Sequence, residues 1–186
     1  MKDIVISDAV KYIGADDKDL DLLESQYIVP NGVSYNSYVI LDEKIAVMDT
    51  IDTRKTDEWK ENLERVLDGR TPDYLVVSHL EPDHAGSIKE FADKYPEAKI
   101  VASAKAIAML PQFFEIADLA DRAVAVKEGE ELSLGSHTLQ FFMAPMVHWP
   151  EVMVEYEKSE KILFSADGFG KFGALEQMKG FYDQFE

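Results

Sequence analysis

The segment SHLEPDHAGS, residues 78–87, carries four side chains that can bind a metal ion: His79, Glu81, Asp83 and His84. Imidazole nitrogens and carboxylate oxygens are the ligands that zinc, iron and manganese take from proteins. A single polar residue in a surface loop is usually only hydrated, but two imidazoles and two acids within six positions indicate a metal site. One segment rarely supplies a whole site, so we expect further ligands downstream.

Two later segments offer such ligands. His148 lies in APMVHWPEVM, between an apolar run and a predicted strand, and Asp167 lies in KILFSADGFGKFG, at the end of another apolar run. The structural alternatives are a histidine that caps a core strand and a turn aspartate before Gly168. The fourth histidine, His137, lies in a predicted hairpin turn, where we expect a hydrated side chain.

The composition excludes several other kinds of protein. The sequence has no cysteine, which excludes disulfides, thiolate catalysis, iron–sulfur clusters and cysteine-based zinc sites. With many carboxylates and no sulfur, the predicted site favours a harder metal than a thiolate site would hold. The net charge of −17, from 19 Lys and Arg against 36 Asp and Glu, argues against nucleic acid and against an anionic membrane surface as partners.

Length and hydrophobicity predict one domain with a substantial core, since 46% of the 186 residues are hydrophobic. No apolar run reaches the ~18 residues of a membrane helix. The N-terminal MKDIVISDAV lacks the pattern of a signal peptide. We therefore expect a cytoplasmic protein with no membrane partner.

The hydrophobic period alternates between that of a strand and that of a helix along the chain. Residues 37–41 and 45–49 predict a hairpin, and residues 59, 63, 66 and 67 mark one face of a helix that Gly69 ends. Residues 73–79 and 98–103 predict buried strands, and 88–95 and 104–110 predict helices. From Val124 the pattern favours β-structure, with hairpins around Gly135 and around residues 158–159, and the tail 173–186 is predicted to be helical.

The metal-binding segment follows a predicted buried strand and precedes a predicted helix. Sites in α/β folds usually lie at such strand ends. Pro82 stiffens the loop, and Gly86 lets the next helix begin close by. Mixed strands, helices and hairpins predict an α/β sandwich and not a simple doubly wound sheet.

These segments resemble the metallo-β-lactamase-like domain of flavodiiron proteins, the A-type flavoproteins. The superfamily pattern is H-x-H-x-D-H, and Glu81 stands where the hydrolases have their second histidine, as in the diiron branch. The family pattern continues with a histidine in an HW motif and then an aspartate. Here 63 residues lie between His84 and His148, and 18 lie between His148 and Asp167. The segments NSYVILDEKIAVMDTID, VHWPEVM and LFSADGFGKFG are also similar, so the resemblance covers essentially the whole chain.

The resemblance implies a metallo-β-lactamase-like αβ/βα sandwich formed by residues 1–186 as a single domain. It also implies a non-haem diiron site, with zinc or manganese as alternative metals after purification. One iron would be held by His79, Glu81 and His148, and the second by Asp83 and His84, with Asp167 as the bridge. The position of His84 turns away from the metal in some members of the family. Such a site reduces O2 to water, or NO to N2O and water.

Two departures from the family pattern shape the expected partners. A last histidine ligand follows the bridging aspartate in the family, but this sequence ends 19 residues after Asp167 with no further histidine. The domain is therefore expected to be incomplete at its C-terminus. No flavodoxin-like domain follows, so FMN is expected only on a partner chain, a flavin-containing electron donor protein. Loss of the last strands would expose an apolar face and a sheet edge, which predicts a homodimer.

Whether the chain is an enzyme is left open between four hypotheses. It is the N-terminal part of a divided O2 or NO reductase, an O2- or NO-binding or sensing protein without turnover, or a remnant that binds metal weakly. The fourth is a zinc hydrolase, in which a zinc-activated water attacks an ester or thioester. Glu81 argues against the hydrolase, because a carboxylate lowers the Lewis acidity of the metal.

Overall fold

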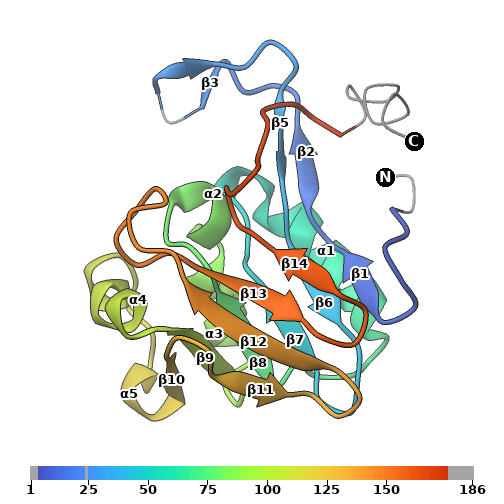
Figure 1. Ribbon diagram of the computed structural model, residues 1–186. Helices are drawn as coiled ribbons and strands as arrows, with labels where there is room; N and C mark the ends of the chain where they lie inside the picture. The colour runs from blue at the N-terminus through green and yellow to red at the C-terminus, as the bar shows by residue number, and fades with distance from the viewer. Residues whose placement is uncertain (1–3, 24, 176–186) are drawn as a thin grey trace.

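Two β-sheets are stacked face to face in the computed structural model, which describes residues 4–23 and 25–175 (Figure 1). The larger sheet has the order β1-β6-β7-β8-β9-β10, antiparallel from β1 to β7 and parallel from β7 to β10. Its strands are β1 (Val10–Tyr12), β6 (Tyr38–Ile40), β7 (Ala46–Met48), β8 (Tyr74–Val77), β9 (Lys99–Ser103) and β10 (Ala123–Val126).

The smaller sheet is antiparallel and has the order β11-β12-β13-β14. Its strands are β11 (Glu131–Ser133), β12 (Thr138–Met143), β13 (Met153–Glu157) and β14 (Ile162–Phe164). Two strand pairs extend beyond the sandwich in Figure 1, β2 (Ala15–Asp17) with β5 (Val33–Tyr35) and β3 (Leu22–Leu23) with β4 (Tyr27–Ile28).

The helices are short, apart from α1 (Thr56–Leu67), which follows the 3-10 turn η1 (Thr53–Lys55). Trp59, Leu63 and Leu67 form its buried face as the sequence predicts, while Val66 is only half-buried. Asp68 ends the helix in the left-handed region at φ 47°, and Gly69 follows at φ 83°. The other helices are α2 (Pro82–Ala85), α3 (Ile88–Lys94), α4 (Ala104–Met109), η2 (Leu110–Gln112) and α5 (Leu119–Arg122).

The predicted alternation of strands and helices is confirmed between residues 37 and 164. The first hairpin pairs Tyr38 with Met48 and Ile40 with Ala46. Strands β1 to β5, which lie before residue 37, have no counterpart in the sequence prediction. Each has only two or three residues, which carry too little periodic signal. The predicted helical tail lies outside the described residues beyond Leu175.

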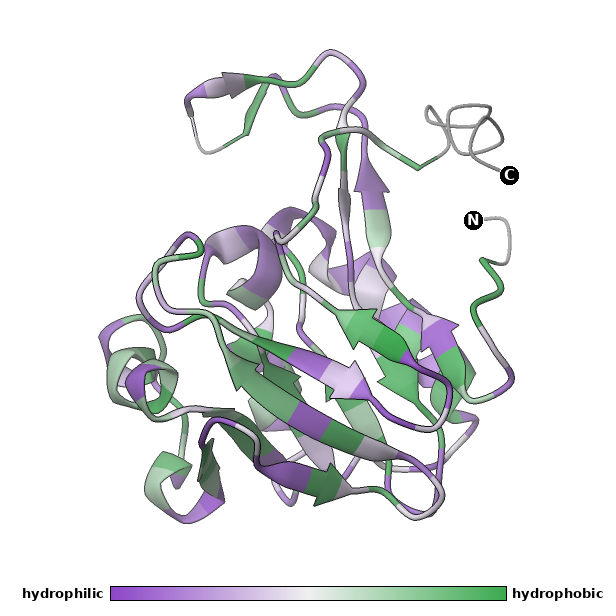
Figure 2. Cartoon of the chain, in the orientation of Figure 1, coloured by the Kyte–Doolittle hydropathy of each residue, from purple (hydrophilic) through white to green (hydrophobic). Residues whose placement is uncertain are grey.

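The strands supply most of the hydrophobic core, as Figure 2 shows by the colour of the two stacked sheets. β8 is buried at Leu75, Val76 and Val77, since it is central in the sheet and flanked by β7 and β9. Trp59 of α1 faces Phe91 of α3, with ring centroids 6.4 Å apart. Within the described ranges, no helix combines the length and apolar character needed to cross a membrane. This core holds the end of β8, where the predicted metal ligands begin.

Candidate metal centre

The four polar side chains of the segment after β8 lie on two local structures, the end of the strand and a short helix. His79 is fully buried just beyond Val77, and Glu81 is the residue that precedes helix α2. We predicted a loop here, but Asp83 and His84 belong to α2 itself. Pro82 occupies the first helical turn, where its fixed φ favours a helix start.

Gly86 allows α2 to pack directly on the backbone that leads from β7 to α1. Its φ is −54°, so the left-handed region is not the reason for glycine here. A Cβ atom would lie 2.7 Å from the carbonyl oxygen of Pro82, 2.8 Å from the nitrogen of Thr53 and 2.9 Å from the carbonyl oxygen of Ile51. The close approach therefore positions α2, and with it Asp83 and His84.

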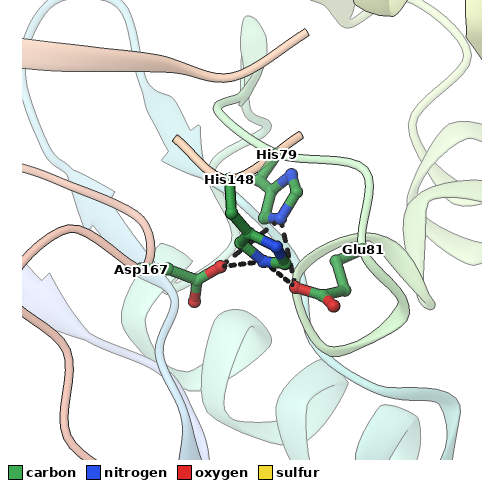
Figure 3. A group of neighbouring side chains, drawn as sticks. All are labelled: His79, Glu81, His148 and Asp167. Atoms are coloured by element: carbon green, nitrogen blue, oxygen red, sulfur yellow. Dashed lines mark hydrogen bonds and ion pairs between the residues drawn. The ribbon is translucent and has the colours of Figure 1, made fainter. Parts of the chain in front are cut away.

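Four of the predicted ligands converge in a first cluster, which Figure 3 shows. The Nε2 atoms of His79 and His148 lie 3.1 Å and 2.8 Å from Oε2 of Glu81. The same two nitrogens lie 3.4 Å and 3.3 Å from Oδ2 of Asp167. His79 is fully buried, whereas the side chain of His148 is 55% exposed, so the cluster is open to solvent on the His148 side.

A second cluster contains Asp83, His84 and again Asp167. Nε2 of His84 lies 2.9 Å from Oδ1 of Asp167 and 3.8 Å from Oδ2 of Asp83. The ring of His84 therefore turns its Nε2 toward the other predicted ligands. Asp167 uses Oδ1 toward His84 and Oδ2 toward His79, so its carboxylate lies between the two clusters.

Two acids that the sequence analysis did not identify hold the far sides of the histidine rings. Oε1 of Glu151, fully buried, lies 2.8 Å from Nδ1 of His79. Oδ2 of Asp49 lies 3.4 Å from Nδ1 of His84. A histidine that binds a metal usually has such an acceptor on its other nitrogen, which orients the ring. The available signal was their position, Glu151 three residues after His148 and Asp49 at the end of a predicted strand.

The surrounding acids make the cluster strongly attractive to positive charge. Burial disfavours charge on His79, but Asp167, Glu151 and Glu81 together raise its pKa to about 11. His84 is likewise opposed by burial, and Asp167 and Asp49 raise its pKa to about 10.

The pKa values of the two carboxyl groups Asp167 and Asp83 are shifted in opposite directions. Burial opposes ionisation of Asp167, but the imidazoles of His79 and His84 hold its pKa well below its usual range. Burial raises the pKa of Asp83. Acids and imidazoles with such displaced pKa values are typical of functional sites.

The donor set fits metal ions. It contains only imidazole nitrogens and carboxylate oxygens, which suit iron, zinc or manganese. Among the described residues, the buried atom Oδ1 of Asp83 makes no hydrogen bond. Buried oxygens of this kind are costly unless they are paired or bind a metal. A cavity of about 540 Å³ lies beside both clusters, and its walls include Glu81, His148 and Asp167.

His137 lies apart from these clusters, as the sequence indicates, but its side chain is not simply hydrated. It is only 13% exposed, and both its ring Nδ1 and its backbone N–H lie within 2.8 Å of Oδ2 of Asp42. The hydrogen bonds tie the β11–β12 turn to the β6–β7 turn. His137 therefore links two turns of the fold and lies outside both candidate ligand clusters.

Two stacked sheets with histidines and acids gathered at the strand ends define a metallo-β-lactamase-like domain. The sequence model of the ODP family beta lactamase matches residues 33–186, and the chain belongs to this family. The chain is 32% identical, over 169 residues, to a nitric oxide reductase of Moorella thermoacetica, covering 90% of this chain and 42% of the relative.

The fold agrees with solved structures of similar proteins. The flavodiiron protein of Giardia intestinalis matches with a TM-score of 0.87 at 30% identity, over 94% of this chain and 42% of that chain. Rubredoxin oxygen:oxidoreductase of Desulfovibrio gigas matches with a TM-score of 0.84 at 34% identity, over 93% and 43%. The chain spans only 26% to 42% of the length of its curated relatives.

Proposed function

We propose that the chain is a non-haem diiron domain for the reduction of O2 to water or of NO to N2O. The observation that carries the proposal is the position of Asp167, which offers one carboxylate oxygen to each of two ligand clusters. The names of the relatives, a nitric oxide reductase and an oxygen oxidoreductase, support the same chemistry.

In this proposal His79, Glu81 and His148 hold one iron, Asp83 and His84 hold the second, and Asp167 bridges them. Zinc or manganese could occupy the same ligands. Two adjacent irons would supply two one-electron centres and stabilise negative charge on a bound diatomic molecule. Asp83 lines the cavity, so the second iron would lie beside the space that a small molecule enters.

The supporting residues fix the rings before any metal arrives. Glu151 accepts a hydrogen bond from Nδ1 of His79, which leaves Nε2 as the nitrogen that faces the cluster. Asp49 lies against Nδ1 of His84 in the same way. The exposed side of His148 leaves a route from solvent into the cavity, so small molecules can reach the clusters from that side.

We further propose that electrons come from a flavin-containing donor protein, with FMN on a partner chain. The chain covers less than half of the length of its relatives, so the flavin and any further ligand would come from residues outside these 186. A homodimer and a cytoplasmic location stay predictions. β14 is an edge strand among the described residues, and Leu163 on it is 47% exposed, which is compatible with a covered edge in a dimer.

Metal content and gas consumption test the proposal. The chain is loaded with ferrous iron under anaerobic conditions, and we expect about two irons per chain. Asp167→Ala should lose binding at both clusters, whereas His137→Gln, a histidine outside the clusters, should keep it. With a chemically reduced flavodoxin as donor, the loaded chain should consume O2 or NO. Unchanged iron content in Asp167→Ala would contradict the bridging role.

Assays of the metal-loaded chain also distinguish two other functions. An O2- or NO-binding protein would bind the gas with two irons present but show no turnover with the reduced donor. A zinc hydrolase is favoured by the size of the cavity, since about 540 Å³ is the size of an organic ligand pocket and exceeds the need of a diatomic gas. Hydrolysis of a chromogenic thioester by the zinc-loaded chain would support the hydrolase.

A further inference from the structure

Strand β13 carries two acids on its inward face, Glu155 and Glu157, and both are fully buried. Alternation along a strand normally places apolar residues at such positions. Glu157 is explained by its partners, because it accepts hydrogen bonds from the backbone N–H groups of Thr138, Ser159 and Glu160. No comparable set of donors surrounds Glu155 in the part of the chain that the structure describes.

Glu155 lies in apolar surroundings in the middle of the sandwich. Its neighbours on the adjacent strands are Phe141 of β12 and Phe164 of β14, and both are buried. Oε2 of Glu155 lies 2.9 Å from the hydroxyl oxygen of Ser78, while Oε1 has no hydrogen-bond partner among the described residues. A charged carboxylate is strongly disfavoured in such a place unless a cation pairs with it.

Charge in the neighbourhood acts in the same direction as burial. Burial raises the pKa of Glu155 well above its usual value, and the nearby charge of Asp49 raises it further. The hydrogen bond to Ser78 opposes this but does not reverse it. The neutral carboxylic acid is therefore the favoured form in the folded chain.

Glu155 also lies directly behind the candidate metal centre. Ser78 is the residue before His79, and its backbone N–H donates to Oδ1 of Asp49 at 2.7 Å. Oδ2 of Asp49 lies 3.4 Å from Nδ1 of His84. A series of contacts thus leads from Glu155 through Ser78 and Asp49 to the ring of His84, a proposed ligand.

We propose that Glu155 is a proton-storing residue of the centre, uncharged in the metal-free chain, that releases its proton when positive charge is added on the His84 side. Its carboxyl O–H bond breaks, the proton passes to a base of the surrounding buffer, and the residue remains as a carboxylate. Glu155 touches no bound molecule in this role, and it acts electrostatically through Asp49. The inference rests on the proposed metal function.

Infrared spectroscopy of the full chain tests the stored proton with zinc as a redox-inert probe. At neutral pH the metal-free chain should show the carbonyl stretch of a buried protonated carboxylic acid, which Glu155→Gln should lack. Zinc should remove this band from the wild-type spectrum. The protons released on zinc binding are counted by titration in weak buffer. The wild-type chain should release about one proton more than Glu155→Gln, since that variant lacks one ionisable group. Glu90→Gln, an exposed acid on α3, should behave as wild type.

The outcomes separate the two proposals. Glutamine is uncharged and of similar shape, so Glu155→Gln should fold with unchanged or higher stability, which urea unfolding checks. Zinc binding with no change in the band, or a metal-free chain without the band, would overturn the proton-storing role alone. Absence of any zinc or iron binding would overturn the proposed metal function and the coupling with it.

Discussion

Oε1 of Glu151 lies 2.8 Å from Nδ1 of His79, and it also accepts a hydrogen bond from the backbone N–H of Leu80 at 2.9 Å. One carboxylate thus holds both the ring and the backbone of the first predicted ligand. Burial opposes its charge, but the hydrogen bond with His79 lowers the pKa of Glu151 below its usual value. The acid therefore stays ionised and fixes which nitrogen of His79 faces the cluster.

Glu151→Ala should weaken metal binding without removing a ligand. Loss of a carboxylate that orients a metal-binding histidine typically costs about 10–100-fold in affinity. Zinc affinity measured by competition with a chelator tests this, and Glu90→Gln serves as the exposed control. An affinity equal to wild type would show that Glu151 does not orient His79 in the loaded chain.

Gly86→Ala should destabilise the fold through the close packing of α2. The added Cβ would meet three backbone atoms at 2.7–2.9 Å, and backbone yields less easily than a flexible side chain. Overpacking of this kind costs about 1–3 kcal/mol in the free energy of unfolding. Urea unfolding measures the loss, and the exposed Lys89→Ala should change stability by less than about 0.5 kcal/mol.

Arg122→Met should also lower the free energy of unfolding. The guanidinium of Arg122 is buried and donates to the backbone carbonyls of Ala92, Tyr95 and Ala98. The carbonyl of Tyr95 also accepts from the backbone N–H of Ala98, so it keeps a donor in this variant. Each buried carbonyl left without a donor costs about 1–3 kcal/mol, so the loss at Ala92 and Ala98 should total about 2 kcal/mol or more. The exposed Arg65→Met on α1 is the matched control, and equal midpoints for both variants in urea would contradict this assignment.

The His137–Asp42 pair should make stability depend on pH. Burial opposes charge on His137, but the hydrogen bond with Asp42 raises the pKa of His137 above 6.5. The contribution of His137 to the free energy of unfolding is therefore complete below pH 6.5, and it is lost as the pH rises through the raised pKa. Asp42 behaves in the opposite sense. Burial acts to raise its pKa, but the hydrogen bonds with His137 outweigh burial and hold the pKa below its usual value, so its contribution to stability is lost only in acid.

Urea unfolding of wild type and His137→Gln at a series of pH values tests this pair. The difference in unfolding free energy between the two chains should shrink as the pH rises above neutral. A difference that stays constant across the alkaline range would show that the charge of His137 does not contribute. His137 lies outside both ligand clusters, so metal content should be equal in the two chains.

Much of the fold was readable from local periodicity. The hairpin at residues 37–49, helix α1 and the buried strand β8 each follow from a run of apolar residues with a clear period. The strands before residue 37 were not predicted, because each has only two or three residues. The placement of Asp83 and His84 on α2 was also missed, since a four-residue helix has no period to detect.

The sequence by itself determined which side chains are candidate ligands. Residue types and spacing selected His79, Glu81, Asp83, His84, His148 and Asp167, because imidazole and carboxylate groups offer the donor atoms that metals take. The tertiary structure alone decided which atoms of these residues meet, and it brought in Glu151 and Asp49 as partners of the two rings. Such contacts join residues 72 and 35 positions apart, from 151 to 79 and from 84 to 49. The first depends on how the two sheets stack, and the second on how β7 and β8 pair within the larger sheet. Periodicity describes only neighbours along the chain, so it contains no information about these distances.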